Sequence, residues 1–386
     1  MPKVLLTGAT RRAGTAAINA LCKEGFTVIG TDDRKFPFNM HSKYTKPYYK
    51  HASFKDNQFY EDILNLIKKE EPDVLLPLLG NNYISLHKEE IKNYTDVLIP
   101  DYESFSSAFS KKKMNEICRK AGISVPQRFS YCEAISLLNF NKNSMLVIKP
   151  DFDEGGATGL RYVKTEQELE EAKLNIQNKY GDYVIEEFIP GSSSMRAVQL
   201  LFSKDNKIAA YFILKKIHQW PITGGVTVCA VSTNERELVD FVLPFFKICP
   251  WEGPVEVELI IDERDKKPKI IEINPRFAGS LLFVIKSGVN FPYIACAEAL
   301  EQKNYGALPS FEAGILYINI THYIRAVLKE FFHAKNKIAS LQKVFKYLIR
   351  KKITTLPEKK DIFIYLAGTY LIVRSKMGHL FAKVFK

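Results

Sequence analysis

The sequence of 386 residues predicts an α/β fold, and two features of its pattern support this prediction. Over the first hundred residues, short apolar strands alternate with amphipathic helices, which is typical of parallel βαβ units and of a sheet covered on both faces. Beyond residue 145, strands follow one another with glycine-rich turns, which indicates a second, α+β domain. A content of 46% hydrophobic and 25% charged residues excludes a disordered or fibrous chain.

The first domain is expected to alternate strands and helices up to about residue 110. Strands are expected over 4–6, 27–30, 74–79 and 97–99, and helices over 13–23 and 62–69. Gly25 is expected to end the first of these helices, because glycine readily takes the backbone conformation that terminates a helix.

The pattern changes at Lys111, where a basic amphipathic helix begins. Gly122 predicts a left-handed cap at its end, and Pro126 follows. Strands joined by a glycine-rich turn are then expected over 145–163, a helix over 166–179, and a strand-rich region up to Glu272. This body is expected to end around Glu312, and residues 317–352 alternate apolar and basic side chains at helical spacing.

The net charge of +12 belongs to the C-terminal extension. From Ile315 onward the sequence has 15 basic and 3 acidic residues, which leaves residues 1–314 neutral. Aromatic residues are interleaved with these lysines, so two roles are expected equally: contact with an anionic membrane or another polyanion, or packing on the body with the lysines in solvent. No nucleic-acid-binding module accompanies the charge, so specific nucleic-acid binding is not expected.

The cysteines and the apolar runs predict a cytoplasmic protein. The six cysteines are spread singly, which fits reduced thiols better than disulfides or a zinc site. The N-terminus lacks the apolar core of a signal peptide, and the apolar run 362–373 is shorter than the roughly 20 residues that a spanning helix needs. A peripheral position at the inner membrane face stays open because of the basic extension, and a homodimer stays open as well.

A glycine turn over residues 7–14 follows the first expected strand and opens the first helix. With Asp32 and Asp33 after the next strand, this turn could bind a dinucleotide in an NAD(P)-dependent reductase. However, Arg11 and Arg12 stand where a glycine would let the backbone approach a pyrophosphate. A turn that binds no cofactor is therefore the favoured interpretation.

A second set of motifs begins with a strand that ends in Lys149. The glycine-rich loop after it, with Gly155, Gly156 and Gly159, could fold its backbone N–H groups over phosphate oxygens. Downstream, Glu186 and Glu187 end an apolar strand just before a Pro-Gly break, where a carboxylate could accept the amino hydrogens of an adenine. Taken alone, each motif could also be an ordinary charged strand with a turn.

Two later strands carry acidic side chains on one face. The two-residue period of a strand places Glu256 and Glu258 on the same side of one strand, and Glu272, Asn274 and Arg276 on the same side of the next. Residues 263–268 form the turn that makes the two strands antiparallel neighbours. Acids that converge in apolar sequence need a cation, and their oxygen atoms suit Mg²⁺ that bridges phosphates.

Together these motifs resemble the ATP-grasp ligases over residues 1 to about 310, most specifically in the stretch EINPRFAGS. The resemblance implies a Rossmann-like pre-ATP-grasp domain over 1–110, an ATP-grasp domain over 111–312 with a lid at about 125–190, and a basic, mostly helical extension over 313–386. It implies the following nucleotide contacts: Lys111 and Lys149 on phosphates, Gly155, Gly156 and Gly159 as a phosphate lid, Glu186 on adenine, and main-chain contacts from Glu187 and Ile189. It also implies ligation of two Mg²⁺ ions, or of Mn²⁺, by Glu258, Glu272 and Asn274, with Arg276 beside the transferring phosphoryl group and the acyl phosphate.

Within that superfamily, the sequence looks most like carboxylate-amine ligases related to the D-aspartate ligases, which carry a basic and aromatic loop before a Gly-Gly pair. In this loop Lys215, Lys216 and His218 are candidates for binding a substrate carboxylate, although a basic surface hairpin is an equal alternative. One departure concerns the ribose, because 192–194 are serines where many members carry a glutamate.

The implied activity joins a small-molecule carboxylate and an amine through an acyl phosphate, with release of ADP and phosphate. Two alternatives remain: the NAD(P)-dependent reductase, and a catalytically silent nucleotide-binding scaffold. The reductase leaves Glu258, Glu272, Asn274 and Arg276 without a role.

Overall fold

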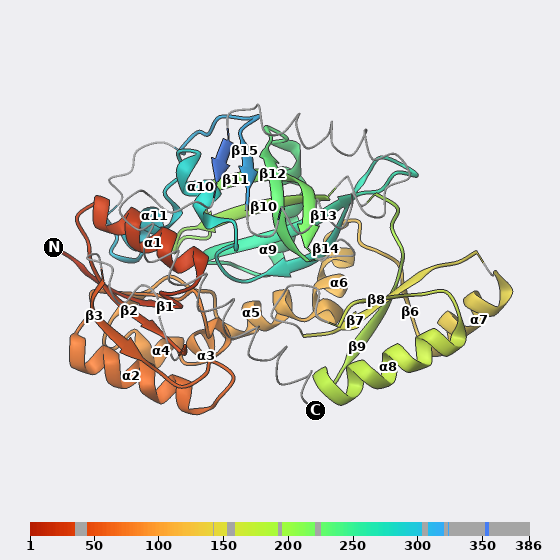
Figure 1. Ribbon diagram of the computed structural model, residues 1–386, viewed down its shortest axis with the longest axis horizontal. Helices are drawn as coiled ribbons and strands as arrows, with labels where there is room; N and C mark the ends of the chain where they lie inside the picture. Colours follow the sequence, from red (N-terminus) through yellow and green to blue (C-terminus); the bar gives the residue numbers. More distant parts are fainter. Residues whose placement is uncertain are drawn as a thin grey trace, which may run out of the picture.

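The computed structural model describes residues 1–34, 45–141, 143–152, 159–191, 195–220, 225–302, 308–319, 323 and 352–354. These residues form three sheets with helices packed on them (Figure 1). Gly155, Gly156, the serines 192–194 and most of the C-terminal extension lie outside the described residues.

The N-terminal sheet is parallel, with the strand order β3-β2-β1-β4-β5. Its strands are β1 (Lys3–Thr7), β2 (Thr27–Asp32), β3 (Thr45–Lys50), β4 (Val74–Leu76) and β5 (Asp96–Val97). The helices of this part are α1 (Arg12–Lys23), α2 (Gln58–Glu70), α3 (Asn81–Leu86), α4 (Lys88–Ile91) and α5 (Tyr102–Phe109). Alternate residues of β1 explain why both faces are covered, since Leu5 packs with α2 and Leu6 packs with α1.

The central sheet has seven strands in the order β14-β13-β10-β11-β12-β15-β16, antiparallel except for the last pair. The strands are β10 (Met195–Phe202), β11 (Ile208–Trp220), β12 (Val226–Ser232), β13 (Gly253–Ile261), β14 (Pro268–Asn274), β15 (Leu316–Ile318) and β16 (Lys352–Thr354). One face packs on α6 (Lys111–Lys120) and α9 (Glu237–Ile248). The other face packs on α1, α10 (Leu281–Lys286) and α11 (Phe291–Ala299), so it faces the N-terminal domain.

The third sheet is small and antiparallel, in the order β6-β9-β7-β8. It consists of β6 (Arg128–Phe129), β7 (Leu146–Pro150), β8 (Arg161–Val163) and β9 (Tyr183–Glu187). Two helices, α7 (Tyr131–Phe140) and α8 (Glu166–Tyr180), cover one of its faces. Figure 1 shows this sheet and its helices as a lobe beside the central sheet, with α6 between them.

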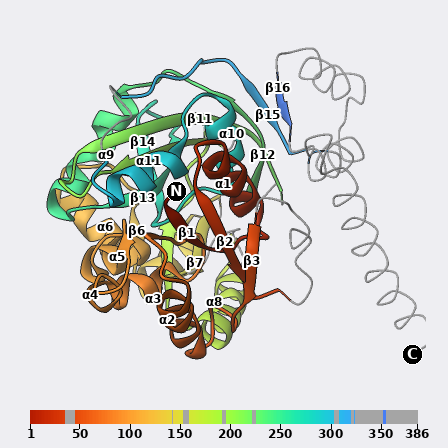
Figure 2. The same cartoon turned by 90° about the vertical axis from the view of Figure 1, so that its left-hand side faces the viewer.

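Two expectations about secondary structure are wrong. The expected loop before the Gly-Gly pair belongs to β11, which pairs with β12 as far as Trp220 opposite Val226. Tyr317 and Lys352, expected at the ends of a helical segment, lie in β15 and β16, at the outer edge of the central sheet in Figure 2. The physical reason is burial, because Tyr317 stacks on Phe283 and completes the apolar face of the sheet.

The central sheet therefore continues past residue 312, the expected end of the body. All six cysteines are free thiols, and four of them are buried. None of the helices in the described part of the chain is long and apolar enough to cross a membrane.

Candidate functional site

Four polar side chains form a square on one face of the central sheet. Glu256 lies directly opposite Asn274, and Glu258 directly opposite Glu272, across the antiparallel pair β13 and β14. Directly opposite residues have their Cβ atoms about 5 Å apart, so the faces expected from the sequence coincide. Three carboxyl groups and an amide oxygen are thereby gathered where the exposed fraction is only 7% for Glu256 and 3% for Asn274.

Two lysines reach the site from other elements. Lys111 is the first residue of α6, and its Nζ lies 3.6 Å from Oε1 of Glu272. Lys149 lies near the end of β7, where its Nζ pairs with Oε2 of Glu186 at 2.8 Å and donates to the carbonyl of Ile271 on β14 at 3.0 Å. The contact to Ile271 ties the small sheet to the central sheet beside the acidic square.

A buried aspartate that the sequence patterns did not single out positions Lys111. Asp151, just after β7, accepts hydrogen bonds from the hydroxyl of Ser110 and from the backbone N–H of Lys112. These two contacts fix the first turn of α6 against the small sheet. Its position two residues after Lys149 could have marked Asp151 as a site residue. Nothing in the sequence, however, predicts its contacts with Ser110 and Lys112, which lie far earlier in the chain.

The charges of the site shift the pKa values of its carboxyl groups in opposite directions. Burial alone would raise the pKa of Glu272, but the positive charges of Lys111, Lys149 and Arg276 outweigh it and lower that pKa. Burial, together with the charge of Glu258, raises the pKa of Glu256 to about 7. Glu272 is thus held as a carboxylate, whereas Glu256 is poised to take up a proton near neutral pH.

Arg276 lies at the end of the same stretch of chain. Its Nη2 donates to Oδ1 of Asn274 at 3.2 Å, and its Nη1 donates to the carbonyl of Phe277 at 3.1 Å. Asn81, at the start of α3, donates to the carbonyl of Pro275 at 3.3 Å, so the N-terminal domain supports this segment directly.

At the end of β9, Glu186 and Glu187 have different environments. Glu186 is 2% exposed and paired with Lys149, and its Oε1 is buried without a hydrogen-bond partner. Glu187 accepts from Lys269 at 2.8 Å and from Arg264 at 2.7 Å, both on the β13–β14 side. Ile189 is buried two residues later. One unsatisfied carboxylate oxygen is therefore left at the position where an adenine amino group is expected.

The three candidates for substrate binding are not brought together. Lys216 points to the site, and its Nζ pairs with Oε2 of Glu258 at 2.7 Å. Lys215 lies opposite Arg196, which pairs with Glu235, so it belongs to the other face of the sheet. His218 lies beside the ring of Tyr323, with 5.8 Å between the ring centroids.

Burial would lower the pKa of Lys216, but the charges of Glu258 and Glu256 raise it above its ordinary value. Lys216 is therefore held as an ammonium group. A further buried amide, Gln199 on β10, donates to the hydroxyl of Ser280 at 2.8 Å and to Glu256 at 3.5 Å.

Of the glycines expected to form a phosphate lid, only Gly159 is described. Its φ is +104°, and a Cβ there would lie 2.8 Å from Cγ of Pro150. A side chain is thus excluded both by the backbone conformation and by lack of space.

The glycine turn of the N-terminal domain is filled by its own side chains. Asp32 accepts from the backbone N–H of Thr10 at 3.0 Å and from its hydroxyl at 2.7 Å, while Arg11 pairs with Asp33. A Cβ on Gly14 would lie 2.1 Å from the carbonyl oxygen of Gly8. One oxygen of the Asp32 carboxylate is therefore taken by Thr10, and the other lies 3.5 Å from Nη2 of Arg11, which disfavours the reductase hypothesis.

The donor set of the square fits a hard divalent cation. Its oxygens come from carboxylates and an amide, which Mg²⁺ prefers, and they are already balanced by nearby positive charges. Among the described residues, no group of three His, Cys, Asp or Glu side chains is arranged so that it could hold a metal ion. Phosphate oxygens or water would have to complete the coordination, as is usual for Mg²⁺.

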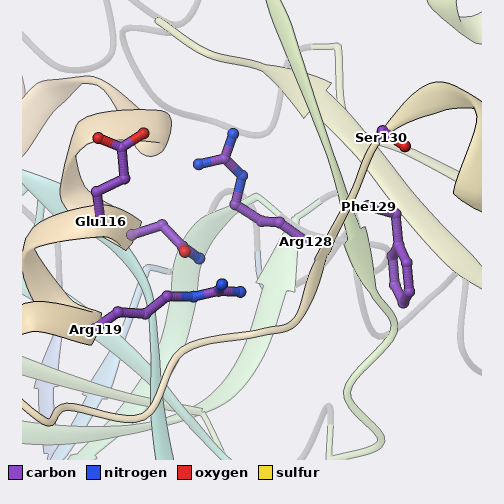
Figure 3. A pocket seen from close by; sticks show the side chains of 6 residues that line it. Glu116, Arg119, Arg128, Phe129 and Ser130 are labelled. Atoms are coloured by element: carbon purple, nitrogen blue, oxygen red, sulfur yellow. The ribbon is translucent and has the colours of Figure 1, made fainter.

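A hollow of about 390 Å³ lies between α6 and β6 (Figure 3). Glu116 and Arg119 reach it from the helix, and Arg128 reaches it from the strand. Arg128 lies directly opposite Glu186 in the β6–β9 pairing, so this hollow borders the strand end where adenine is expected.

A family model and several known proteins are similar to parts of this chain. Residues 108–280 match the family model of the ATP-grasp domain. A D-aspartate ligase of Enterococcus faecium is 24% identical over 262 residues, covering 61% of this chain and 62% of the relative, so the chain spans less than two thirds of that protein's length.

Among solved structures, the N5-carboxyaminoimidazole synthetase of Staphylococcus aureus complexed with ADP has a TM-score of 0.68 at 13% identity, covering 90% of this chain and 96% of that one. The biotin carboxylase domain of the Hydrogenobacter thermophilus 2-oxoglutarate carboxylase, in complex with MgADP, has a TM-score of 0.65 at 17% identity and covers 80% of this chain and 72% of that one. At these identities the likeness shows the fold.

Proposed function

Because the chain carries an ATP-grasp domain over residues 108–280, we propose that it is an ATP-dependent carboxylate-amine ligase that acts through an acyl phosphate. One observation supports this most: the acidic square of β13 and β14 lies within reach of Lys111 from α6 and close to Lys149 from the small sheet. This arrangement supports a site in which carboxylates would hold a metal and the two lysines would bind phosphates, as phosphoryl transfer requires.

ATP would bind between the small sheet and the central sheet. Lys111 and Lys149 would neutralise its phosphates, and Gly155, Gly156 and Gly159 would cover them and exclude water. The free oxygen of Glu186 supports its role on the adenine amino group, with the main chain at Glu187 and Ile189 beside it. The side-chain contacts of Glu187 point to a structural task for that carboxylate, which leaves only its backbone for the nucleotide.

Glu258, Glu272 and Asn274 would hold Mg²⁺, and we propose two ions, with Mn²⁺ as a substitute. When bound, the metal would spread the negative charge of the phosphates. The biotin carboxylase domain seen with MgADP has the same fold, which supports this assignment.

In the reaction, a carboxylate oxygen of the substrate would attack the γ-phosphorus of ATP, and the bond to the ADP oxygen would break. Arg276, which donates to Asn274, would balance the charge of the phosphoryl group and of the acyl phosphate. The amine nitrogen would then attack the acyl carbon, the carbon–oxygen bond to phosphate would break, and the amine would lose a proton. The products are an amide, ADP and phosphate.

The substrates are small molecules in this proposal, and the D-aspartate ligase relative suggests amino acids as the first to test. Of the candidates for substrate binding on β11, Lys216 lies at the site, whereas Lys215 lies on the opposite face of the sheet. We further propose that residues 1–110 form a Rossmann-like pre-ATP-grasp domain that supports the Arg276 segment, because its sheet is parallel and Asn81 donates to the carbonyl of Pro275.

A screen for ADP release tests the proposal. Purified full-length protein with Mg²⁺ and ATP is offered pairs of amino acids or sugar acids with amines, and ADP and amide are measured together. ADP release that requires both substrates is expected, and Glu272→Gln should abolish it. Hydride transfer to NADP⁺ would contradict the ligase and favour the reductase. If any pair of substrates yields an amide, the hypothesis of a catalytically silent scaffold is excluded.

A further inference from the structure

Lys216 occupies an unusual place for a lysine in the middle of a sheet. Its side chain is 3% exposed, and its ammonium group bonds to Oε2 of Glu258 at 2.7 Å, on the same face as the acidic square. Glu258 is itself only 16% exposed. The proposed metal ligand therefore already has an internal cation from its own sheet.

We propose that Lys216 and a divalent metal ion are alternative partners of Glu258, and that the ammonium group released by the metal binds the anionic substrate group. This inference rests on the proposed function, since it takes Glu258 as a metal ligand. It adds an order of events: the metal must bind before the anion, because only then is Lys216 released.

Competition follows from the geometry. A magnesium ion lies about 2.1 Å from a carboxylate oxygen that it binds, and the ammonium nitrogen lies 2.7 Å from the same oxygen. Two cations on one oxygen would stand only a few ångströms apart, in a buried place where solvent screens their repulsion weakly. One of them must move, and the lysine, on its flexible stem, is the one that can.

Once displaced, Lys216 needs a new anion. Its ammonium group is buried, and a buried charge without a partner is strongly unfavourable. Its neighbour across the ladder, Ala230, has no polar side chain. Of the two other carboxyl groups whose charges act on Lys216, Glu272 is itself a proposed metal ligand and Glu256 also interacts with Arg276. An incoming carboxylate or phosphate would provide the missing charge, which couples anion affinity to metal binding.

The chain contains a matched control in the neighbouring residue. Lys215 lies on the opposite face, across from Arg196. Its charge acts there on Glu235. Burial alone would raise the pKa of Glu235, but Arg196, which pairs with it, and Lys215 lower that pKa below its ordinary value. Substitution of Lys215 changes the net charge by the same amount in the same strand, but on the face of the sheet away from Glu258.

The test is Mn²⁺ binding by the full-length protein in the presence of ADP, measured by electron paramagnetic resonance. Lys216→Met should bind Mn²⁺ about tenfold more tightly than the wild type, whereas Lys215→Met and Lys216→Arg should stay within about twofold. In a Glu258→Gln background, Lys216→Met should have no further effect. Equal or weaker Mn²⁺ binding by Lys216→Met, with an unchanged thermal midpoint, overturns the competition.

Inorganic phosphate is the probe for the second step. Calorimetric titration with phosphate should show binding to the Mn²⁺·ADP complex of the wild type and of Lys215→Met, and about tenfold weaker binding to Lys216→Met. If phosphate binds Lys216→Met as well as the wild type, the handover to an anion is wrong. Neither titration needs turnover. Both can therefore support this inference even if the screen finds no ligase activity, and both can contradict it even if the screen finds such activity.

Discussion

Lys149 and Glu186 form a buried ion pair that joins β7 to β9 and, through the carbonyl of Ile271, to β14. Such a pair is expensive to break, because removal of one partner leaves the other charge buried. Lys149→Met should therefore lower the free energy of unfolding by about 3 kcal/mol and weaken nucleotide binding. Urea unfolding and ADP titration measure the two effects.

The double variant Lys149→Met/Glu186→Leu separates stability from binding. Removing both charges should restore most of the stability, while nucleotide binding stays weak because the phosphate cation and the carboxylate beside adenine are both absent. If the double variant binds ADP like the wild type, neither Lys149 nor Glu186 has a role in the nucleotide site.

Glu256 predicts a dependence of stability on pH. Its pKa in the folded protein is raised to about 7, above the ordinary value of a glutamate, so the folded state holds this proton where the unfolded state has lost it. The stability that the neutral carboxyl contributes is present below about pH 4.5 and is lost as the pH rises to about 7.

Glu256→Gln cannot lose that proton. In metal-free buffer, the variant should gain stability relative to the wild type between pH 5 and pH 7.5, by up to about 3 kcal/mol. Denaturant unfolding of both proteins at the two pH values measures this. A constant difference between them would show that Glu256 does not titrate in this range.

The sequence alone located the chemistry of single residues better than their partners. The two-residue period was sufficient to place Glu258 and Glu272 on matching faces, because a strand alternates whatever surrounds it. The pairing of Lys216 with Glu258 could not be predicted, since it depends on β10 lying between β11 and β13 in the sheet. Lys215 and Lys216 face opposite sides of the sheet because they are neighbours in a strand, and the sequence had predicted a loop there.

At the scale of elements, the turn between β13 and β14 is joined to the end of β9 by four charged side chains. Glu187 contacts Arg264 and Lys269, and both of these contact Asp262. The hydrogen bonds from Arg264 hold the pKa of Asp262 well below its usual range. This network fixes the backbone of residues 186–189 relative to the central sheet.

Lys269→Ala should loosen that connection. We expect nucleotide affinity to fall severalfold, since the strand end beside adenine would be less well ordered, with a loss of about 1 kcal/mol in unfolding free energy. Lys267→Ala, in the same turn but exposed, is the control and should behave like the wild type. ADP titration of both variants decides; equal affinities would mean that the network does not position the nucleotide site.

The elements themselves were largely predictable, with two exceptions: the end of β11, expected as a loop, and the strands β15 and β16, expected within a helical segment. Strands and helices with a clear apolar period, such as β1 and α8, appear where the sequence places them. The sequence does not predict that β11 continues beyond Leu214, because Lys215, Lys216 and His218 interrupt its apolar pattern. The charges of the two lysines are balanced on opposite faces of the strand, since Lys216 pairs with Glu258 and Lys215 acts on Glu235.

At the scale of the whole molecule, charge is divided between a neutral body and a basic extension. We propose that the extension contacts an anionic surface. Because β15 and Tyr323 belong to the core, removing everything after residue 312 would damage the central sheet. A cleaner change keeps the full chain and replaces its last six basic residues: Lys359, Lys360, Arg374, Lys376, Lys383 and Lys386.

With glutamine at these six positions, flotation with vesicles of anionic lipid should be lost, while ADP release stays unchanged, since none of the six is among the proposed site residues. Vesicles of neutral lipid are the control and should bind neither protein. If the six-fold variant floats as the wild type does, the contact with an anionic membrane is wrong.

The central claim, ligation through an acyl phosphate, has a direct isotopic test. A substrate carboxylate labelled with ¹⁸O is incubated with the full-length protein, ATP, Mg²⁺ and the amine, and the released phosphate is analysed by mass spectrometry. The mechanism predicts one ¹⁸O atom in each phosphate, because the carboxylate oxygen that attacks ATP leaves with the phosphoryl group. Amide formation with unlabelled phosphate would contradict it.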